Sequence, residues 1–192
     1  QTVTDYDLQL LYNAITWSRY EPHDIAITKV TPSKSVVGQG YSLNINVTAA
    51  NQGDYTETFN VTVYANTTII ETKTSITLTG GNFTTLNFTW NTTGFAKGNY
   101  TISAYAWPVP GETDFDDNNC TDRWITVTWL GDLDADLDVD EDDLWAFCEA
   151  FIDYYKIHVK DPLCDFDDDC DIDEDDLWTF CEAFIYYWKQ PH

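Results

Sequence analysis

Acidic side chains at regular spacing carry the most evident chemistry in this sequence. Two segments near the C-terminus place carboxylates at positions 1, 3, 5, 9 and 12 of a twelve-residue loop. They are Asp132, Asp134, Asp136, Asp140 and Asp143 in the first loop, and Asp165, Asp167, Asp169, Asp173 and Asp176 in the second. Ca²⁺ takes about six to eight oxygen ligands, and this spacing wraps one loop around one ion. Position 7, Asp138 or Asp171, is expected to add its backbone carbonyl, so the sequence predicts two Ca²⁺ sites.

The two loops belong to a tandem repeat. The stretch "GDLDADLDVDEDDLWAFCEAFIDYY" from Gly131 aligns with "CDFDDDCDIDEDDLWTFCEAFIYYW" from Cys164 at an offset of 33 residues. Each loop leads into an amphipathic helix, predicted over Leu144 to about Tyr155 and over Leu177 to about Trp188. A merely solvated acidic surface is the alternative, and the shared register of the two copies argues against it.

A loop followed by a helix, twice, with Asp at position 12, is similar to the dockerin family over residues 131–189. This resemblance implies a calcium-dependent module that contacts a cohesin partner through loop positions 10 and 11. Those positions are Glu141-Asp142 and Glu174-Asp175, where cellulosomal dockerins often carry Ser or Thr. The charged residues therefore do not match a cohesin of the usual kind.

Position 6 of each loop departs from the dockerin pattern. It is normally Gly, because the backbone there turns with positive φ, but this sequence has Leu137 and Cys170. A non-glycine residue in that conformation costs about 1 to 2 kcal/mol. We therefore expect a loop that bends differently or binds its ion more weakly.

The charge of the chain indicates a cation as partner. Against 33 Asp and Glu stand 9 Lys and Arg, a net charge of −24, and residues 130–192 hold 21 acidic and 3 basic side chains. Such a charge repels nucleic acid and anionic membrane surfaces. No apolar run approaches the ~20 residues that span a bilayer, so no membrane insertion is expected. With 43% hydrophobic and 16% aromatic residues, the acidic part is nevertheless expected to fold.

Short segments of alternating polarity fill the middle of the chain and predict seven strands. These are Asp24 to Val30, Tyr41 to Ala49, Glu57 to Asn66, Ser75 to Thr79, Phe83 to Trp90, Tyr100 to Ala106 and Arg123 to Trp129. Turn signals such as Asn51-Gln52-Gly53-Asp54 separate them. This spacing is typical of an immunoglobulin-like β-sandwich.

The stretches "HDIAITKVTPSKSVVGQGYSLNINVTAANQGDYTETFNVTVYAN" and "LNFTWNTTGFAKGNYTISAYAWPVPGETDFDDNN" resemble the CARDB family, a cell-adhesion-related domain of bacteria that is also common in archaeal surface proteins. The resemblance covers about residues 22–128. Its most specific parts are the Asn51-Gln52-Gly53 turn, the Phe88-Thr89-Trp90 strand end and the segment from Glu112 to Asn119. It implies a non-catalytic spacer or adhesion module. The acidic turn from Glu112 to Asp117 is expected to be a solvated loop, with cation binding as the alternative.

Eight Asn-x-Thr acceptors for N-glycosylation lie between residues 22 and 129. They are Asn46, Asn60, Asn66, Asn82, Asn87, Asn91, Asn99 and Asn119. Strand parity places Asn46, Asn60, Asn87 and Asn99 on the face opposite the core. We therefore expect a glycosylated extracellular protein, the alternative being that Thr-rich strands create sequons by chance. The absence of Met fits a processed form or a fragment.

Five cysteines fit an oxidising compartment and leave one without an internal partner. Duplicated loop–helix units are expected to pack about a pseudo-twofold axis, which brings the equivalent Cys148 and Cys181 together. Cys164 and Cys170 flank the second loop and form the second candidate pair. Cys120 is then the odd one.

Residues 1–20 resemble half of the same repeat. "VTDYDLQLLYNAITW" from Val3 aligns with "VDEDDLWAFCEAFID" from Val139, and Leu8, Leu11, Tyr12 and Ile15 have helical spacing. Two interpretations stay open: an amphipathic helix that packs on its own subunit, or a detached element that docks on the C-terminal helices of another molecule.

Each predicted C-terminal helix has more apolar surface than a single contact with the other helix can bury. In the first, Leu144, Phe147 and Phe151 form one stripe, and Trp145, Cys148 and Ile152 form another. The second stripe is expected either to meet another protein or to pack on the β-sandwich.

Taken together, the sequence predicts a mainly β protein with an immunoglobulin-like β-sandwich, a small helical dockerin-like module and an N-terminal helix. The domains are expected at 1–21, 22–129 and 130–192. The predicted function is that of a non-catalytic, calcium-stabilised, glycosylated archaeal cell-surface protein that self-assembles head to tail into a filament or layer. The alternative is an anchoring module that binds a cohesin-like surface protein or carbohydrate. The symmetric Glu149 and Glu182 suggest a glycosidase pair, but helix-surface charge explains them better.

Overall fold

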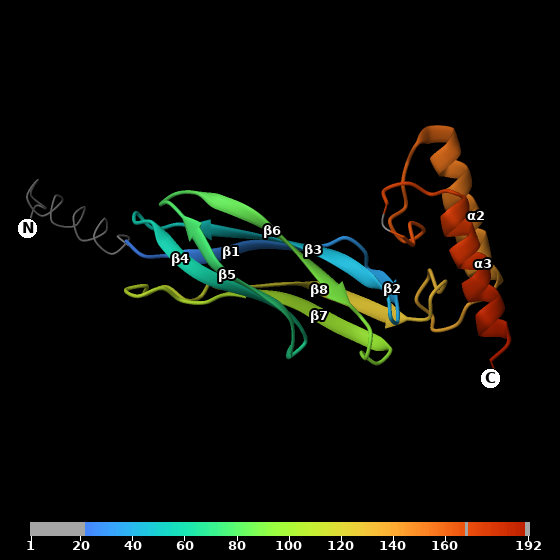
Figure 1. Ribbon diagram of the computed structural model, residues 1–192, viewed down its shortest axis with the longest axis horizontal. Coiled ribbons are helices and arrows are strands. Elements are labelled where there is room, and N and C mark those ends of the chain that lie inside the picture. Colours follow the sequence, from blue (N-terminus) through green and yellow to red (C-terminus); the bar gives the residue numbers. More distant parts are fainter. Residues whose placement is uncertain (1–21, 168, 191–192) are drawn as a thin grey trace, which may run out of the picture.

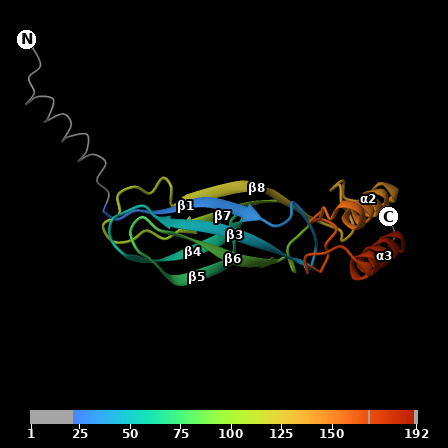
Figure 2. The ribbon, with the colours of Figure 1, turned by 90° about the horizontal axis from the view of Figure 1, so that it is seen from above.

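Two β-sheets packed face to face form most of the protein. The computed structural model describes residues 22–167 and 169–190, so the predicted N-terminal helix and the domain assigned to residues 1–21 fall outside the described residues. One sheet has the order β1-β3-β6 and the other β2-β8-β7-β4-β5 (Figures 1 and 2). The strands are β1 (Ile25–Pro32), β2 (Val36–Gly38), β3 (Ser42–Asn51), β4 (Glu57–Ala65), β5 (Thr68–Leu78), β6 (Phe83–Asn91), β7 (Gly98–Ala106) and β8 (Asn119–Thr128). The predicted immunoglobulin-like β-sandwich is confirmed.

Alternation along the strands builds the core of the sandwich. Every second side chain of β3 is buried, beginning with Leu43, and its antiparallel register with β6 sets Leu43 opposite Trp90 and Ile45 opposite Phe88. Trp90 and Phe88 are the largest fully buried side chains of the sandwich. Burial of large apolar side chains contributes about 1.5 to 3 kcal/mol each, so this register is strongly specified.

Two strands differ from the predicted seven. The short β2 is an eighth strand that pairs in parallel with β8, from Val36 opposite Thr126 to Gly38 opposite Thr128. The strand expected at Ser75 to Thr79 is only the end of β5, an edge strand whose pattern is mostly exposed or half-buried. Because an edge strand buries little of either face, its sequence does not need to alternate between apolar and polar residues. The first half of β5, which begins at Thr68, therefore shows no strand pattern in the sequence.

Two helices, α2 (Glu141–Ile157) and α3 (Glu174–Trp188), lie side by side at one end of the sandwich (Figures 1 and 2). Each begins three residues earlier than predicted. Asp140 is the N-cap of α2 and forms a capping box with Asp143, and Asp173 does the same with Asp176 in α3. Reciprocal capping satisfies backbone donors that a helix start leaves free.

A separate aromatic core holds the helical part together. The rings of Phe147 and Phe180, which are equivalent in the repeat, stack 4.9 Å apart at 12°, and Phe166 lies against both. Ile172 and Cys164 complete the buried cluster. Neither described helix is long and apolar enough to span a bilayer.

Candidate metal centre

The first acidic loop gathers its carboxylates between β8 and α2, with Asp132 and Asp143 buried and Asp134 and Asp136 exposed. The carboxylate oxygens of Asp132, Asp134 and Asp136 come within 4.8 Å of one another, as do those of Asp138, Asp140 and Asp143. Asp143 Oδ1 accepts from Leu133 N at 2.6 Å, and its Oδ2 accepts from Asp140 N at 2.9 Å. The carboxylate at position 12 therefore closes the loop as well as capping the helix.

The second loop repeats this arrangement. Asp176 Oδ1 accepts from Phe166 N at 2.5 Å and its Oδ2 from Asp173 N at 3.0 Å. The described carboxylates that cluster within 4.8 Å are Asp165, Asp167 and Asp176, and Asp171, Asp173 and Asp176. Asp169 stands apart from these clusters, and its Oδ1 accepts from Asp171 N at 3.0 Å. Eleven of the twelve predicted ligand residues thus fall in clusters of three carboxylates; the two clusters of the second loop share Asp176, whereas those of the first share no residue.

Buried carboxylate oxygens without a hydrogen-bond partner indicate whether a cation fits these loops. Oδ1 of Asp132 and Oδ1 of Asp138 are buried without a hydrogen-bond partner, and so are the equivalent atoms of Asp165 and Asp171. A buried carboxylate oxygen without a partner is costly. Buried oxygens without a partner occur at the same two loop positions in both copies. Hard carboxylate oxygens are the donors that Ca²⁺ or Mg²⁺ prefers. The donor set therefore fits a hard divalent cation.

The position-7 residues contribute more than the sequence predicts. A backbone carbonyl was expected from them, but the side-chain oxygens of Asp138 and Asp171 also lie among the other carboxylates. In the twelve-residue loop pattern, position 7 contributes its backbone carbonyl. The pattern therefore does not predict where an acidic side chain at that position points.

Desolvation and mutual repulsion raise the pKa values of the loop carboxylates. Burial raises the pKa of Asp143 to about 6, with the negative charge of Asp132 adding to the shift. Burial is also the main cause of the raised pKa of Asp132 and Asp176. These carboxylates hold their charge at a cost that a bound cation removes.

The loops keep the expected backbone turn in spite of the missing glycines. Leu137 and Cys170 both have φ of 83°, and Ala135 has φ of 66°. The expectation of a differently bent loop is wrong at position 6, because hydrogen bonds hold the turn, such as Leu137 N to Asp132 Oδ2 at 3.0 Å. The left-handed conformation of the two position-6 side chains remains a local strain.

Residues of the sandwich hold the first residue of each loop. The Thr128 hydroxyl, at the end of β8, donates to Asp132 Oδ2. Lys34 donates through Nζ to the backbone oxygen of Asp165 at 2.5 Å, and Lys160 pairs with the Asp165 carboxylate. Sequence reasoning missed Lys34, because 131 residues separate it from its acceptor and no local pattern marks it.

The second apolar stripe of α2 does not pack on the sandwich. Trp145 is 73% exposed and Ile152 46%, whereas Phe147 is fully buried. The equivalent residues of α3, Trp178 and Ile185, are 67% and 52% exposed. Of the two alternatives left open by the sequence, packing of this stripe on the sandwich is therefore wrong.

All five cysteines lie in the described part of the chain, and each is a free thiol. The predicted Cys148–Cys181 and Cys164–Cys170 pairs are not formed. The pseudo-twofold contact is made by the preceding residue in each helix, the phenylalanine of the aromatic core, and one helical step of about 100° turns the cysteine outward. Cys164 is buried in the aromatic core, whereas Cys170 is exposed.

The predicted glycosylation sites are accessible. Seven of the eight sequon asparagines are exposed: Asn46, Asn66, Asn82, Asn87, Asn91, Asn99 and Asn119. Asn60 is half-buried, and its Oδ1 accepts from Ser75 N at 3.0 Å. Asn46 and Asn87 are cross-strand neighbours joined by a hydrogen bond of 3.0 Å. Glycosylation itself stays a prediction.

Other acidic residues have structural or surface roles. Glu112, expected in a solvated or cation-binding turn, is buried and accepts from Ile25 N, Val109 N and Asn118 Nδ2 at 2.8 to 3.0 Å. Glu112 therefore joins the loop between β7 and β8 to the start of β1 through hydrogen bonds. Glu149 and Glu182 are exposed on the helices.

Comparisons with known proteins concern the sandwich. The family model of CARDB, a non-catalytic domain family, matches residues 22–123. A search among curated proteins finds no match. The chain is similar to the CARDB domain of a Pyrococcus furiosus protein in complex with di-metal ions, at 25% identity, covering 56% of this chain and 96% of that one, with a TM-score of 0.48.

Two further solved structures are similar over the same region. A domain of a proposed cell surface protein from Methanosarcina acetivorans is 25% identical, with 55% of this chain and 91% of that one covered and a TM-score of 0.44. A β-glucosidase from Erythrobacter marinus is 15% identical, with 55% and 15% covered and a TM-score of 0.43. The match to the family model spans more than half of the sequence, and the chain therefore belongs to the CARDB family.

Proposed function

We propose that this chain is a non-catalytic extracellular structural protein of an archaeal cell surface. In this proposal the acidic loops bind two Ca²⁺ ions, the sequons carry glycans, and copies associate head to tail into a filament or layer. Residues 1–20 of one copy dock on the C-terminal helical part of the next. The observation that carries the proposal is the pair of equivalent loops, each with buried, unpartnered carboxylate oxygens.

The carboxylates of both loops form the proposed dockerin-like calcium module. The first ion would be held by Asp132, Asp134, Asp136, Asp138, Asp140 and Asp143, and the second by Asp165, Asp167, Asp169, Asp171, Asp173 and Asp176. A bound Ca²⁺ supplies positive charge that offsets the repulsion among these side chains. Ca²⁺ is favoured over Mg²⁺ because so many carboxylates suit its higher coordination number. Because the loops begin both helices, calcium is also expected to stabilise the helical part.

Exposed apolar side chains on the helices support association between copies. The described helices expose apolar side chains, including Trp145, Trp178 and Trp188, more than half of whose surface is accessible. Exposed apolar surface of this kind marks interaction sites in soluble proteins. A heterologous contact between two different ends of the chain, repeated from copy to copy, gives an open filament.

Electron microscopy and light scattering on the purified chain test this function. Filaments that form in millimolar Ca²⁺, and vanish both after chelation and on deletion of residues 1–20, are expected. A monodisperse calcium-loaded monomer would contradict self-assembly. It would favour the alternative, an anchoring module that takes a cohesin-like partner or carbohydrate.

A further inference from the structure

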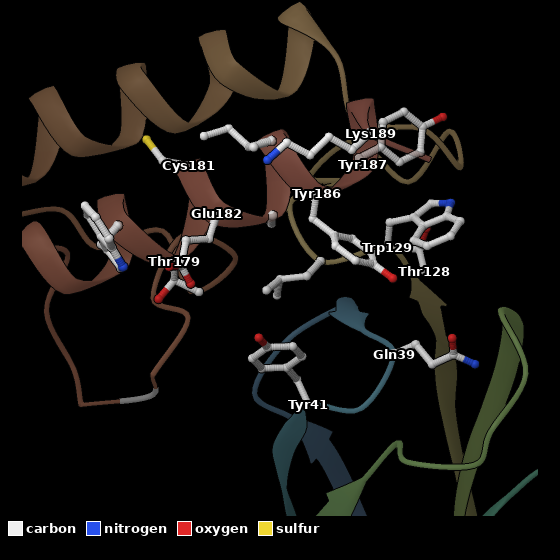
Figure 3. Close-up of a pocket in the computed structure, with 14 residues that line it drawn as sticks. Gln39, Tyr41, Thr128, Trp129, Thr179, Cys181, Glu182, Tyr186, Tyr187 and Lys189 are labelled. Atoms are coloured by element: carbon white, nitrogen blue, oxygen red, sulfur yellow. The ribbon is translucent and has the colours of Figure 1, made fainter. Parts of the chain in front are cut away.

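We propose that a groove between α3 and the end of the sandwich is the seat for residues 1–20 of a second copy of the chain. This inference rests on the proposed head-to-tail assembly and names its contact surface. The groove is the α3 groove, lined by Tyr41 and Trp129 from the sandwich and by Trp178, Ile185 and Tyr186 from α3 (Figure 3).

The α3 groove is large and aromatic. Its volume is about 840 Å³, and Figure 3 shows Tyr41 and Tyr186 directed into it from opposite sides. The rings of Trp129 and Tyr187 meet edge to face at 5.6 Å, which joins α3 to the sandwich on one side of the space. Trp178 and Tyr186 remain 67% and 60% exposed, so this aromatic surface is available to an incoming segment.

The exposed stripe of α3 matches the N-terminal segment in spacing and length. Trp178, Cys181 and Ile185 recur at helical spacing along the groove and span eight residues, about 10 Å of helix. The stripe from Leu8 to Ile15 also spans eight residues with helical spacing. An amphipathic helix that lays such a stripe into an apolar groove is a common mode of peptide recognition.

The length of the chain favours an occupant from a second copy. Pro22 lies beside the end of β3, where its backbone oxygen accepts from Asp54 N at 3.0 Å, whereas Tyr41, at the groove, immediately precedes the start of β3. The ten residues of β3 separate these points by about 30 Å. The seven Cα–Cα steps from Ile15 to Pro22 reach at most ~25 Å when fully extended. Ile15 therefore falls short of Tyr41 of its own copy, so the whole stripe from Leu8 to Ile15 is seated more readily in the groove of a neighbour.

A matched pair of substitutions tests the seat. Ile185→Asp places a charge in the α3 groove, and Ile152→Asp makes the same change at the equivalent, similarly exposed position of α2, which is outside it. In millimolar Ca²⁺, Ile185→Asp is expected to raise the concentration needed for assembly at least tenfold, and Ile152→Asp to leave it near that of the wild type. Circular dichroism and calcium uptake check that both variants fold.

A cross-link gives a second, independent measurement. Cys181 lines the groove, so Leu11→Cys is expected to form an oxidised dimer that Cys181→Ser abolishes and Cys148→Ser retains. If filaments need residues 1–20 yet neither Ile185→Asp nor Cys181→Ser has an effect, the groove is not the seat and the proposed function stands. If the wild type never assembles, both the seat and the head-to-tail function are overturned.

Discussion

Lys34, in the turn between β1 and β2, donates a 2.5 Å hydrogen bond to the backbone oxygen of Asp165 and so joins the sandwich to the second acidic loop. The side chain of Lys34 is largely buried, with 9% of its surface exposed. A contact across 131 residues at the first position of a loop couples the position of α3 to the sandwich.

Substitution of Lys34 is expected to loosen the helical part. Hydrogen bonds from charged groups contribute about 1.5 to 3 kcal/mol, so Lys34→Met should lower the free energy of unfolding by roughly that amount. Lys29→Met, on the exposed part of β1, is the control. Thermal unfolding of both in Ca²⁺ checks this, and equal midpoints for the two variants would argue against the coupling.

Glycine at position 6 of the first loop is expected to stabilise the protein slightly. Leu137 has φ of 83° and a half-exposed side chain, so Leu137→Gly relieves left-handed strain of about 1 to 2 kcal/mol, offset by the ~0.5 to 1 kcal/mol that glycine costs in chain entropy. Leu137→Ala keeps the strain and controls for loss of the side chain. Unfolding midpoints should rank Leu137→Gly above Leu137→Ala, and the reverse order would show that the turn is unstrained.

The metal-free protein is expected to lose stability as the pH rises. Burial raises the folded-state pKa of Asp143 from 3.8 to about 6, so the folded state binds more protons than the unfolded state between these values. The stabilisation is fully present below about pH 4 and is lost as the pH rises through 6. Thermal unfolding in chelator from pH 4 to 7 measures this loss of stability. Asp143→Asn should make the unfolding midpoint less dependent on pH. A stability that rises over this window relative to Asp143→Asn would contradict the assignment.

Thiol reactivity should separate the three exposed cysteines from the buried one, with the half-buried Cys120 reacting at an intermediate rate. Cys148, Cys170 and Cys181 are exposed and should react with a maleimide in the native protein. Cys164 is buried, and burial raises the pKa of its thiol to about 12, so it should react only on unfolding. Mass spectrometry after labelling counts the modified residues. If the denatured chain had only one reactive thiol, that result would instead support the two predicted disulfides.

Patterns with a local period could be predicted well. The period of two in β3 and β6 identified the residues that face the core, and the carboxylate register identified both acidic loops. Each of these signals lies within about a dozen residues and follows from burial or from ligand spacing. The helix starts were missed by three residues because Asp140 and Asp173 serve at once as loop residues and as N-caps.

Long-range contacts could not be predicted. The bond from Lys34 to Asp165, the parallel pairing of β2 and the α3 groove depend on how distant segments meet. The disulfide prediction was wrong because the sequence gives the symmetry of the repeat but not which residue lies on the axis. The structure places the Phe147 and Phe180 rings there.

Calcium titration by calorimetry tests the central claim most directly. Two ions per chain are expected for the wild type, and one for Asp132→Asn or for Asp165→Asn, because each substitution removes a buried oxygen from one loop only. Asp153→Asn, on the exposed surface of α2, should still bind two. A wild-type chain that takes up no calcium, or an Asp132→Asn Asp165→Asn double variant that still binds two ions, would contradict the account.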